Sequence, residues 1–190
     1  YKRQVQTLTG FKWIGKVPGL AFGYEEALGY CVAPQIARDK DGISAALVVL
    51  DLASRLHADG ADLLSRLEEI YAEHGWHATG QVTLRVGETA VLDAIMERIR
   101  AIPPRELGGL AVQSVDDLAE GYAGLPPSNG LRIDLGGGSR VIIRPSGTEP
   151  KLKCYLQVVL DWAGSADDTR AVADTALARL AEDVRALIAP

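Results

Sequence analysis

Apolar positions recur at helical spacing in two neighbouring segments of the first half of the chain. The first segment covers residues 43–58, and a break at the Asp59-Gly60 pair separates it from the second. Gly75 stands where a glycine commonly ends a helix. The pattern therefore predicts two successive helices. Their apolar positions are Ile43, Leu47 and Leu50 in the first, and Leu63, Leu67, Ile70 and Tyr71 in the second.

The spacing changes after Gly75. Residues 81–86 alternate between polar and apolar side chains, as a half-buried strand does, and helical spacing returns over 91–99. Such a change from helical segments to alternating segments is typical of a domain boundary. We expect this boundary near residues 75–80 and divide the chain into residues 1–77 and 78–190.

The clearest strand signal lies in the second half of the chain. Apolar and polar residues alternate over 131–135, a Gly-Gly-Gly-Ser turn follows at 136–139, and a further apolar run covers 140–143. This order predicts a β-hairpin. After a polar loop, alternation returns over 152–158 and predicts another strand of the same sheet.

The chain closes with a predicted helix. Ser165 to Asp168 resembles a capping box, and apolar residues then recur at helical spacing as far as Leu187. The order strand, helix, several strands, helix predicts an α+β domain for residues 78–190, in which an antiparallel sheet packs against helices. Residues 1–77 are typical of part of an α/β unit.

Composition excludes several classes of protein. Nearly half of the 190 residues are apolar, so a folded core is expected, but no apolar run reaches the roughly 18 residues that cross a membrane. The net charge of −5 argues against broad nucleic-acid binding, which needs a basic surface. Cys31 and Cys154 fit no metal-ligand spacing, so we expect a reducing compartment, the cytoplasm.

The polar loop at 144–151 carries the strongest candidate chemistry. Arg144 offers a charged fork, Ser146 and Thr148 offer hydroxyl donors, and Gly147 lets backbone N–H groups approach an anion. These groups suit a phosphate. The loop lacks the Gly-Lys-Ser/Thr of a nucleotide-binding P-loop, and an ordinary polar hairpin with a surface arginine is the alternative interpretation.

A second candidate lies at residues 22–30, where Glu25 and Glu26 form a pair of carboxylates. Carboxylates of this kind accept hydrogen bonds from sugar hydroxyls. The alternative is a solvated acidic turn, and general acid–base work by the pair needs pKa shifts that a sequence does not contain.

Four segments resemble the α-D-phosphohexomutases, the superfamily of phosphoglucomutases and phosphomannomutases. Residues 144–150 resemble the family's phosphate-binding loop, and residues 22–30 resemble its sugar-binding loop. Residues 7–14 and 38–42 resemble two further segments at the family's ligand face. The four matches occur in the family's order and span most of the chain.

The resemblance implies a role for each matching residue. Ala27 stands where many members have serine, and Trp13 and Ile14 are expected to pack in the core, with Asp41 as a helix N-cap. The implied sugar-binding residues are Thr9, Gly10, Glu25, Glu26 and Lys40. The implied phosphate-binding residues are Arg144, Ser146, Gly147, Thr148 and Lys151.

The resemblance also implies a fold and an activity. Residues 1–77 correspond to the end of the family's third, α/β domain, and residues 78–190 to its fourth domain, which is similar to the TATA-box-binding protein. The intact enzymes move phosphate between C1 and C6 of a hexose through a bisphosphate, with Mg²⁺ and a sugar bisphosphate activator.

The family's phosphoserine loop and its Asp-rich metal loop do not occur in these 190 residues. We therefore expect no catalytic residue and no metal ligand in this chain. The expected partners are a phosphosugar substrate and the N-terminal domains of the same protein. Neither nucleic acid nor a membrane is expected as a partner.

Three alternatives stay open from the sequence. The chain's sequence is also similar to members of the superfamily that handle pentose phosphates, so a phosphopentomutase is the first alternative. The second is a sugar-phosphate binding module without catalysis. The third is a structural or nucleic-acid-binding α+β domain, which the negative charge disfavours.

Overall fold

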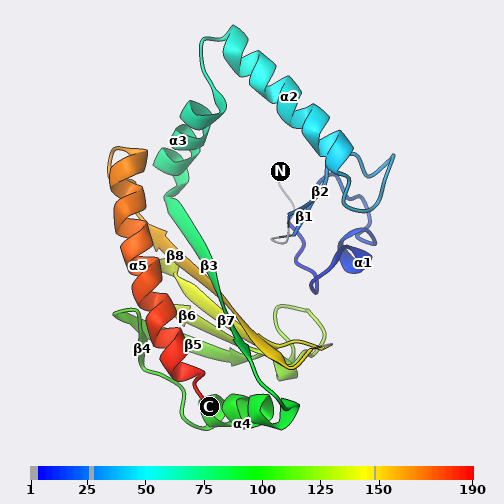
Figure 1. The fold of residues 1–190 in the computed structure, drawn as a ribbon. Coiled ribbons are helices and arrows are strands. Elements are labelled where there is room, and N and C mark those ends of the chain that lie inside the picture. The colour runs from blue at the N-terminus through cyan, green and yellow to red at the C-terminus, as the bar shows by residue number, and fades with distance from the viewer. Residues whose placement is uncertain (1–3, 26–27, 148) are drawn as a thin grey trace. The chain divides into compact units, whose positions relative to one another are not determined.

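The fold is that of a computed structural model, which describes residues 4–25, 28–147 and 149–190. The chain forms two compact units, residues 1–67 and 68–190 (Figure 1). Glu26, Ala27 and Thr148 lie outside the described residues. In the described part of the chain, no helix is both long and apolar enough to span a bilayer.

The first unit contains a short hairpin and the two helices that the sequence predicts. The hairpin pairs Tyr24 with Tyr30 and Glu25 with Gly29 across its two antiparallel strands. Phe11 and Cys31 are the buried apolar residues around it. The elements are α1 (Phe11–Ile14), β1 (Gly23–Glu25), β2 (Gly29–Cys31), α2 (Gly42–Ala58) and α3 (Leu63–His74), of which α3 continues into the second unit.

The start of α2 confirms the predicted N-cap. The Asp41 carboxylate accepts a hydrogen bond from the Ile43 N–H at 3.0 Å, which satisfies one of the unpaired donors of the first turn. The expectation that Trp13 packs in the core is wrong, because its side chain is 41% exposed. Instead, the Lys12 and Lys16 ammonium groups lie 5.6 and 5.9 Å from the centre of its ring.

Many apolar side chains of α2 are exposed. None of its residues is buried, although its sequence is periodic enough to form an apolar face. The exposed large apolar side chains of α2 are Ile43, Leu47, Val48, Val49, Leu50 and Leu52.

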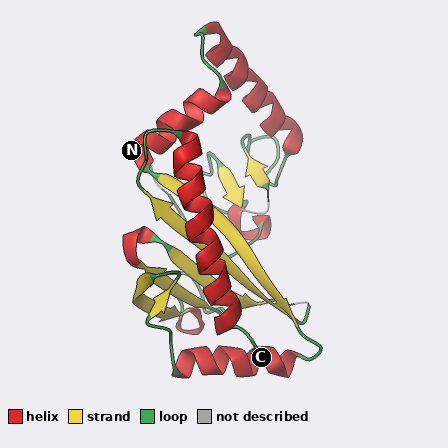
Figure 2. Cartoon of the chain, turned by 60° about the vertical axis from the view of Figure 1, so that its left-hand side comes forward, coloured by secondary structure: helices red, strands yellow, loops and turns green. Residues whose placement is uncertain are grey.

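The second unit is built on a six-stranded antiparallel sheet, which confirms the α+β architecture (Figures 1 and 2). Its strand order is β3-β8-β7-β6-β5-β4, so β7 and β8 are neighbouring interior strands. The strands are β3 (Trp76–Arg85), β4 (Glu106–Leu107), β5 (Leu110–Asp117), β6 (Leu131–Leu135), β7 (Arg140–Pro145) and β8 (Lys151–Leu160). The remaining elements are the helices α4 (Thr89–Ala101) and α5 (Ala166–Leu187) and the short 3₁₀ turns η1 (Leu118–Glu120) and η2 (Gly136–Gly138).

Alternation along the strands separates a core face from a polar face. On β8, Leu152 and Cys154 are fully buried, whereas Lys153 and Tyr155 lie half-buried on the opposite face. The long helix α5 covers the core face and packs on β3 and β8 (Figure 2). The side chains of α5 that are fully buried are Ala173, Leu180 and Val184.

The predicted hairpin at 131–143 is confirmed, and its turn explains its glycines. Gly137 and Gly138 have φ angles of 68° and 78°, in the left-handed region that glycine adopts without a steric penalty. The strand predicted at 81–86 is longer than expected and begins at Trp76. An aromatic cluster holds this extension, because the Tyr71 and Trp76 rings lie 4.2 Å apart, centre to centre.

Candidate functional site

The predicted phosphate-binding loop joins two interior strands of the sheet, β7 and β8. Arg144 and Pro145 are the last residues of β7, and Lys151 is the first residue of β8. The Ser146 N–H donates to the Lys151 carbonyl at 2.8 Å, so the two ends of the loop are tied together. The loop is therefore a short, closed turn on a rigid base, although Thr148 itself lies outside the described residues.

Within this loop, Lys151 forms an ion pair with Glu149. The Lys151 side chain is only 15% exposed, and its backbone N–H donates to the Glu149 carbonyl at 2.7 Å. The pKa of Glu149 lies below its ordinary range, chiefly because of Lys151 and also because of the positive charges of Arg85 and Lys153. The ammonium group that the sequence assigns to phosphate thus already has a carboxylate partner.

Positive side chains face one another across the strands at this end of the sheet. Arg85 on β3 pairs with Lys151 on β8, and Arg144 on β7 pairs with Lys153 on β8. Like charges directly opposite each other destabilise a sheet. The sheet contains this destabilising arrangement at the base of the loop. Together the cations create a positive potential there, which favours the binding of an anion.

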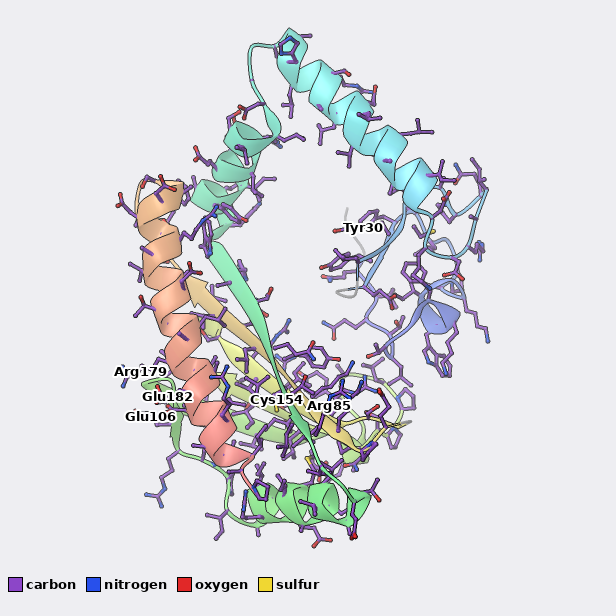
Figure 3. The ribbon with its side chains drawn as sticks, viewed as in Figure 1. Tyr30, Arg85, Glu106, Cys154, Arg179 and Glu182 are labelled. Carbon is purple, nitrogen blue, oxygen red and sulfur yellow. The ribbon has the colours of Figure 1, made fainter. Side chains whose placement is uncertain are left out.

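Sequence reasoning missed Arg85 and Lys153 as members of this cluster. Alternation over 81–86 places Arg85 on the polar face, but no sequence pattern gives the partner of that strand. Figure 3 shows Arg85 at the loop end of the sheet and Cys154 within its interior. The register of β3, β8 and β7 is what brings the four cations together.

Gly147 leaves open space at the tip of the loop. It is exposed, and a Cβ built on it meets no atom within 4 Å. The backbone at Gly147 is therefore sterically open to a ligand. An alanine at this position fits the unliganded fold without a clash, which makes it a useful variant for a binding test.

In the first unit, Glu25 packs over Gly29 beside the Phe11 ring. A Cβ built on Gly29 lies 2.6 Å from Cγ of Glu25 and 2.7 Å from Cε2 of Phe11, closer than side-chain atoms approach. Glycine is thus the residue that lets the Glu25 carboxylate fold back across the hairpin. Glu26, its predicted partner, lies outside the described residues.

Lys40 lies on the same Phe11 ring. Its ammonium group is 5.3 Å from the ring centre and 3.1 Å from the Asp39 carboxylate. Gly10, with a φ of 112°, directly precedes Phe11 and follows the exposed Thr9. The structure therefore brings Glu25 and Lys40 to one aromatic side chain from two separate segments of the first unit, and the Thr9-Gly10 pair directly precedes that aromatic residue in the sequence.

Comparison with known families gives a match for each of the two segments that hold these candidate residues. A family model described as "Phosphoglucomutase/phosphomannomutase, alpha/beta/alpha domain III" matches residues 2–74, and one described as "Phosphoglucomutase/phosphomannomutase, C-terminal domain" matches residues 82–163. The chain belongs to the phosphoglucomutase/phosphomannomutase family. The Glu25 group lies in the segment that matches domain III, and the Arg144 loop lies in the segment that matches the C-terminal domain.

Relatives of this chain carry names that describe different activities. A probable phosphomannomutase of Haemophilus influenzae is 47% identical over 152 residues, which are 80% of this chain and 30% of that protein. A probable phosphoribomutase of Schizosaccharomyces pombe is 36% identical over 179 residues, with the same two shares. The chain thus spans about 30% of the length of these relatives.

A solved structure of a phosphoglucomutase shares the fold. It is the exocytosis-sensitive phosphoprotein pp63/parafusin from Paramecium in an open form, and it matches with a TM-score of 0.58 at 19% identity. The match covers 86% of this chain and 29% of the parafusin chain. The fold of the chain is therefore similar to that of this phosphoglucomutase structure.

The family's Mg²⁺ has no ligand set among the residues described here. Within 4–25, 28–147 and 149–190, no three His, Cys, Asp or Glu side chains gather closely enough to hold a metal ion.

Proposed function

We propose that this chain supplies the sugar-binding and phosphate-binding parts of a phosphosugar mutase. The reaction is the interconversion of 1-phospho and 6-phospho hexoses through a bisphosphate intermediate, which also serves as activator. In this proposal residues 1–77 bind the sugar and residues 78–190 bind the phosphate that is not being transferred. The observation that carries the proposal is the cluster of like-charged residues at the base of the 146–150 loop.

The phosphate role follows from the chemistry of the loop. A phosphate dianion is strongly hydrated, so its binding site must replace lost water with charge-assisted hydrogen bonds. Arg144 provides a planar fork, and Ser146 and Thr148 provide hydroxyl groups. Gly147 contributes a backbone N–H, and Arg85 and Lys153 add positive charge beside the loop, while Lys151 is already paired with Glu149.

The sugar role falls to the residues around Phe11. The Glu25 carboxylate, with Glu26 beside it in the sequence, accepts hydrogen bonds from sugar hydroxyls. Thr9, Gly10 and Lys40 donate to the sugar or its phosphate. Such contacts select one orientation of the ring, and binding energy spent on orientation raises the rate of the transfer step.

A mutase needs both groups of residues. The bisphosphate intermediate must turn so that each end meets the phosphate-transferring group, and the idle phosphate must be held while the other reacts. The Arg144 loop suits this holding task, because it recognises a phosphate and contacts no part of the sugar that differs between the two orientations.

The similarity to the probable phosphoribomutase supports a second candidate, a mutase of pentose phosphates. A comparison of kcat/KM for glucose 1-phosphate, mannose 1-phosphate and ribose 1-phosphate distinguishes the two. A hexose preference supports the first proposal, and a pentose preference replaces it with the second.

The phosphate role is tested with the substitution Arg144→Ala in the full-length protein. Loss of one charged hydrogen-bond donor to phosphate costs about 2–3 kcal/mol, so kcat/KM is expected to fall about 10²-fold. The measurement is a coupled assay with the preferred phosphosugar. Unchanged kinetics remove Arg144 from the site and with it the proposed role of the loop.

Two further variants make this test specific. Arg140→Ala removes a positive side chain from the same face of β7, away from the loop, where Arg140 pairs with Gln157 of β8. Its kcat/KM is expected to stay within about 3-fold of the parent value. Gly147→Ala adds a methyl group that meets no neighbouring atom. This variant is expected to raise KM while leaving the melting temperature unchanged.

A further inference from the structure

Three side chains join the end of α4 to the end of β5 and to the loop before β6. The Arg100 guanidinium donates to both Asp117 carboxylate oxygens, from Nε at 2.8 Å and from Nη2 at 3.3 Å. The same Nη2 donates to the Asn129 side-chain oxygen at 2.8 Å. Asp117 also accepts a hydrogen bond from the Ala119 N–H at 3.0 Å.

The contact at Asn129 fixes a loop that is closed at its base. The Leu118 N–H donates to the Gly130 carbonyl at 2.9 Å, and the Ser128 N–H donates to the Leu118 carbonyl at 2.8 Å. Asn129 lies between these two backbone contacts. Arg100 therefore holds the loop 118–130 by a side chain at the point where the backbone enters β6.

This point lies directly beside Arg144. The paired part of β6 and β7 ends at Leu131 and Ile143, so the next residues along the two strands are Gly130 and Arg144. A Cβ built on Gly130 lies 3.1 Å from the Ile143 carbonyl oxygen and 3.5 Å from Cβ of Arg144. On its other side, Arg144 pairs with Lys153 of β8.

The backbone at Arg144 is thus held firmly on one side and less firmly on the other. β8 holds one side through a continuous ladder, whereas Gly130 holds the other side beyond the last pair of the β6–β7 ladder. What keeps Gly130 in place is the loop closure at Leu118 and the contact between Arg100 and Asn129.

We propose that Arg100 is a positioning residue for phosphate binding: by fixing Asn129 and Gly130, it sets the backbone position of Arg144. The inference rests on the phosphate-binding role proposed above for Arg144. Arg100 itself touches no ligand in this proposal. A displacement of a binding group by about 1 Å is enough to weaken its contribution strongly, so a brace of this kind affects binding from a distance.

The test is Arg100→Gln in the protein as its gene encodes it, with inorganic phosphate as a competitive inhibitor. Glutamine cannot bridge Asp117 and Asn129 at once, so the inhibition constant of phosphate is expected to rise about 5- to 10-fold. Arg100→Lys keeps the charge but not the fork, and its inhibition constant is expected to lie between the two.

The decisive measurement repeats Arg100→Gln in an Arg144→Ala background. If Arg100 acts through Arg144, the second substitution adds no further rise to the inhibition constant, since coupled residues are not additive. An equal rise in both backgrounds overturns the inference. If Arg144→Ala alone leaves the inhibition constant unchanged, the proposed function of the loop fails, which is a different outcome.

Arg98 provides a matched control on the same helix. Its Nη2 donates to the Leu187 and Ala189 carbonyls at 3.0 and 2.5 Å, so it braces the end of α5 instead of the loop. Arg98→Gln is expected to lower the melting temperature and leave phosphate inhibition unchanged. If Arg100→Gln behaves in the same way, its role is structural and the inference is wrong.

A second variant covers the case in which Arg100→Gln does not fold. Asn129→Ala removes only the loop contact and leaves the Arg100–Asp117 pair in place. It is expected to raise the inhibition constant of phosphate to a similar extent, and an unchanged constant in a folded Asn129→Ala protein also overturns the inference.

Discussion

Cys154 places a thiol in the interior of the sheet, on β8 between Leu152 and Leu156. It is fully buried, and this burial raises the pKa of the thiol from its ordinary 9.0 to about 12. Because the folded pKa lies above the unfolded one, the contribution of the neutral thiol to stability is complete below pH 9 and is lost as the pH rises toward 12.

We predict that Cys154 resists alkylation in the folded protein. At pH 8 the thiol is neutral and shielded, so its reaction with iodoacetamide is expected to be at least about 100-fold slower than that of an exposed cysteine. Thr83→Cys, on the exposed face of neighbouring β3, gives the reference rate. Peptide mass spectrometry measures both, and similar rates contradict the prediction.

Residue chemistry predicted the candidate phosphate loop but not the residues that surround it. The functional groups of Arg144, Ser146 and Gly147 are visible in the sequence because they are adjacent in it. Arg85 comes beside the loop through strand pairing, and the sequence does not specify which strand is the neighbour. The same reason hides the ion pair that engages Lys151, since its partner Glu149 looks like any exposed acid.

Among the elements, α5 has the clearest start. The Ser165 hydroxyl accepts a hydrogen bond from the Asp168 N–H at 3.1 Å and donates to the Asp168 carboxylate at 2.7 Å. The predicted cap is thereby confirmed. It precedes a helix whose buried residues pack on β3 and β8, so a weaker cap affects the whole second unit.

We predict that Ser165→Ala lowers stability by about 1 kcal/mol, the usual cost of removing an N-cap. The melting temperature is expected to fall by roughly 3–5 °C for a unit of this size. Thr175→Ala is the control, because Thr175 bonds back to Ala171 within the helix and alanine is the better helix former. Equal shifts in thermal unfolding of the two variants would argue against a capping role.

Periodicity predicted most of the long elements but missed the eight-residue strand β5 and the short elements. Helices α2 to α5 and the hairpin of β6 and β7 follow from spacing alone, because each repeats its pattern over several turns or pairs. The helix α1 and the strands β1 and β2 have only three or four residues each, too few for a period to show. The extension of β3 back to Trp76 depends on ring packing with Tyr71, which spacing does not encode.

At the scale of the whole molecule, these 190 residues carry the proposed binding groups but not the loops that perform transfer in the family. Its 190 residues contain neither a Ser-His phosphoserine segment nor an Asp-Gly-Asp-Gly-Asp metal segment. Periodicity also predicted an apolar face on α2, but the sequence of a helix does not say what covers it, and in this structure six apolar side chains of α2 are exposed.

We predict that the 190-residue chain by itself has no mutase activity. The physical reason is that phosphate held by Arg144 and sugar held by Glu25 still need an acceptor for the phosphoryl group. A coupled assay with glucose 1-phosphate and its 1,6-bisphosphate measures this, with the protein as its gene encodes it as the positive control. Turnover at the rate of that control contradicts the prediction.

The position of the 146–150 loop between two paired interior strands, β7 and β8, affects how this protein can vary. A residue inserted within β8 exchanges its buried row for its polar row and disrupts the core along the rest of the strand. A residue inserted between Gly147 and Pro150 changes only the turn, because the ladder of β7 and β8 resumes at Pro145 and Leu152. Mutational drift can therefore lengthen this turn, and so change the proposed phosphate site, while the strands below it stay intact.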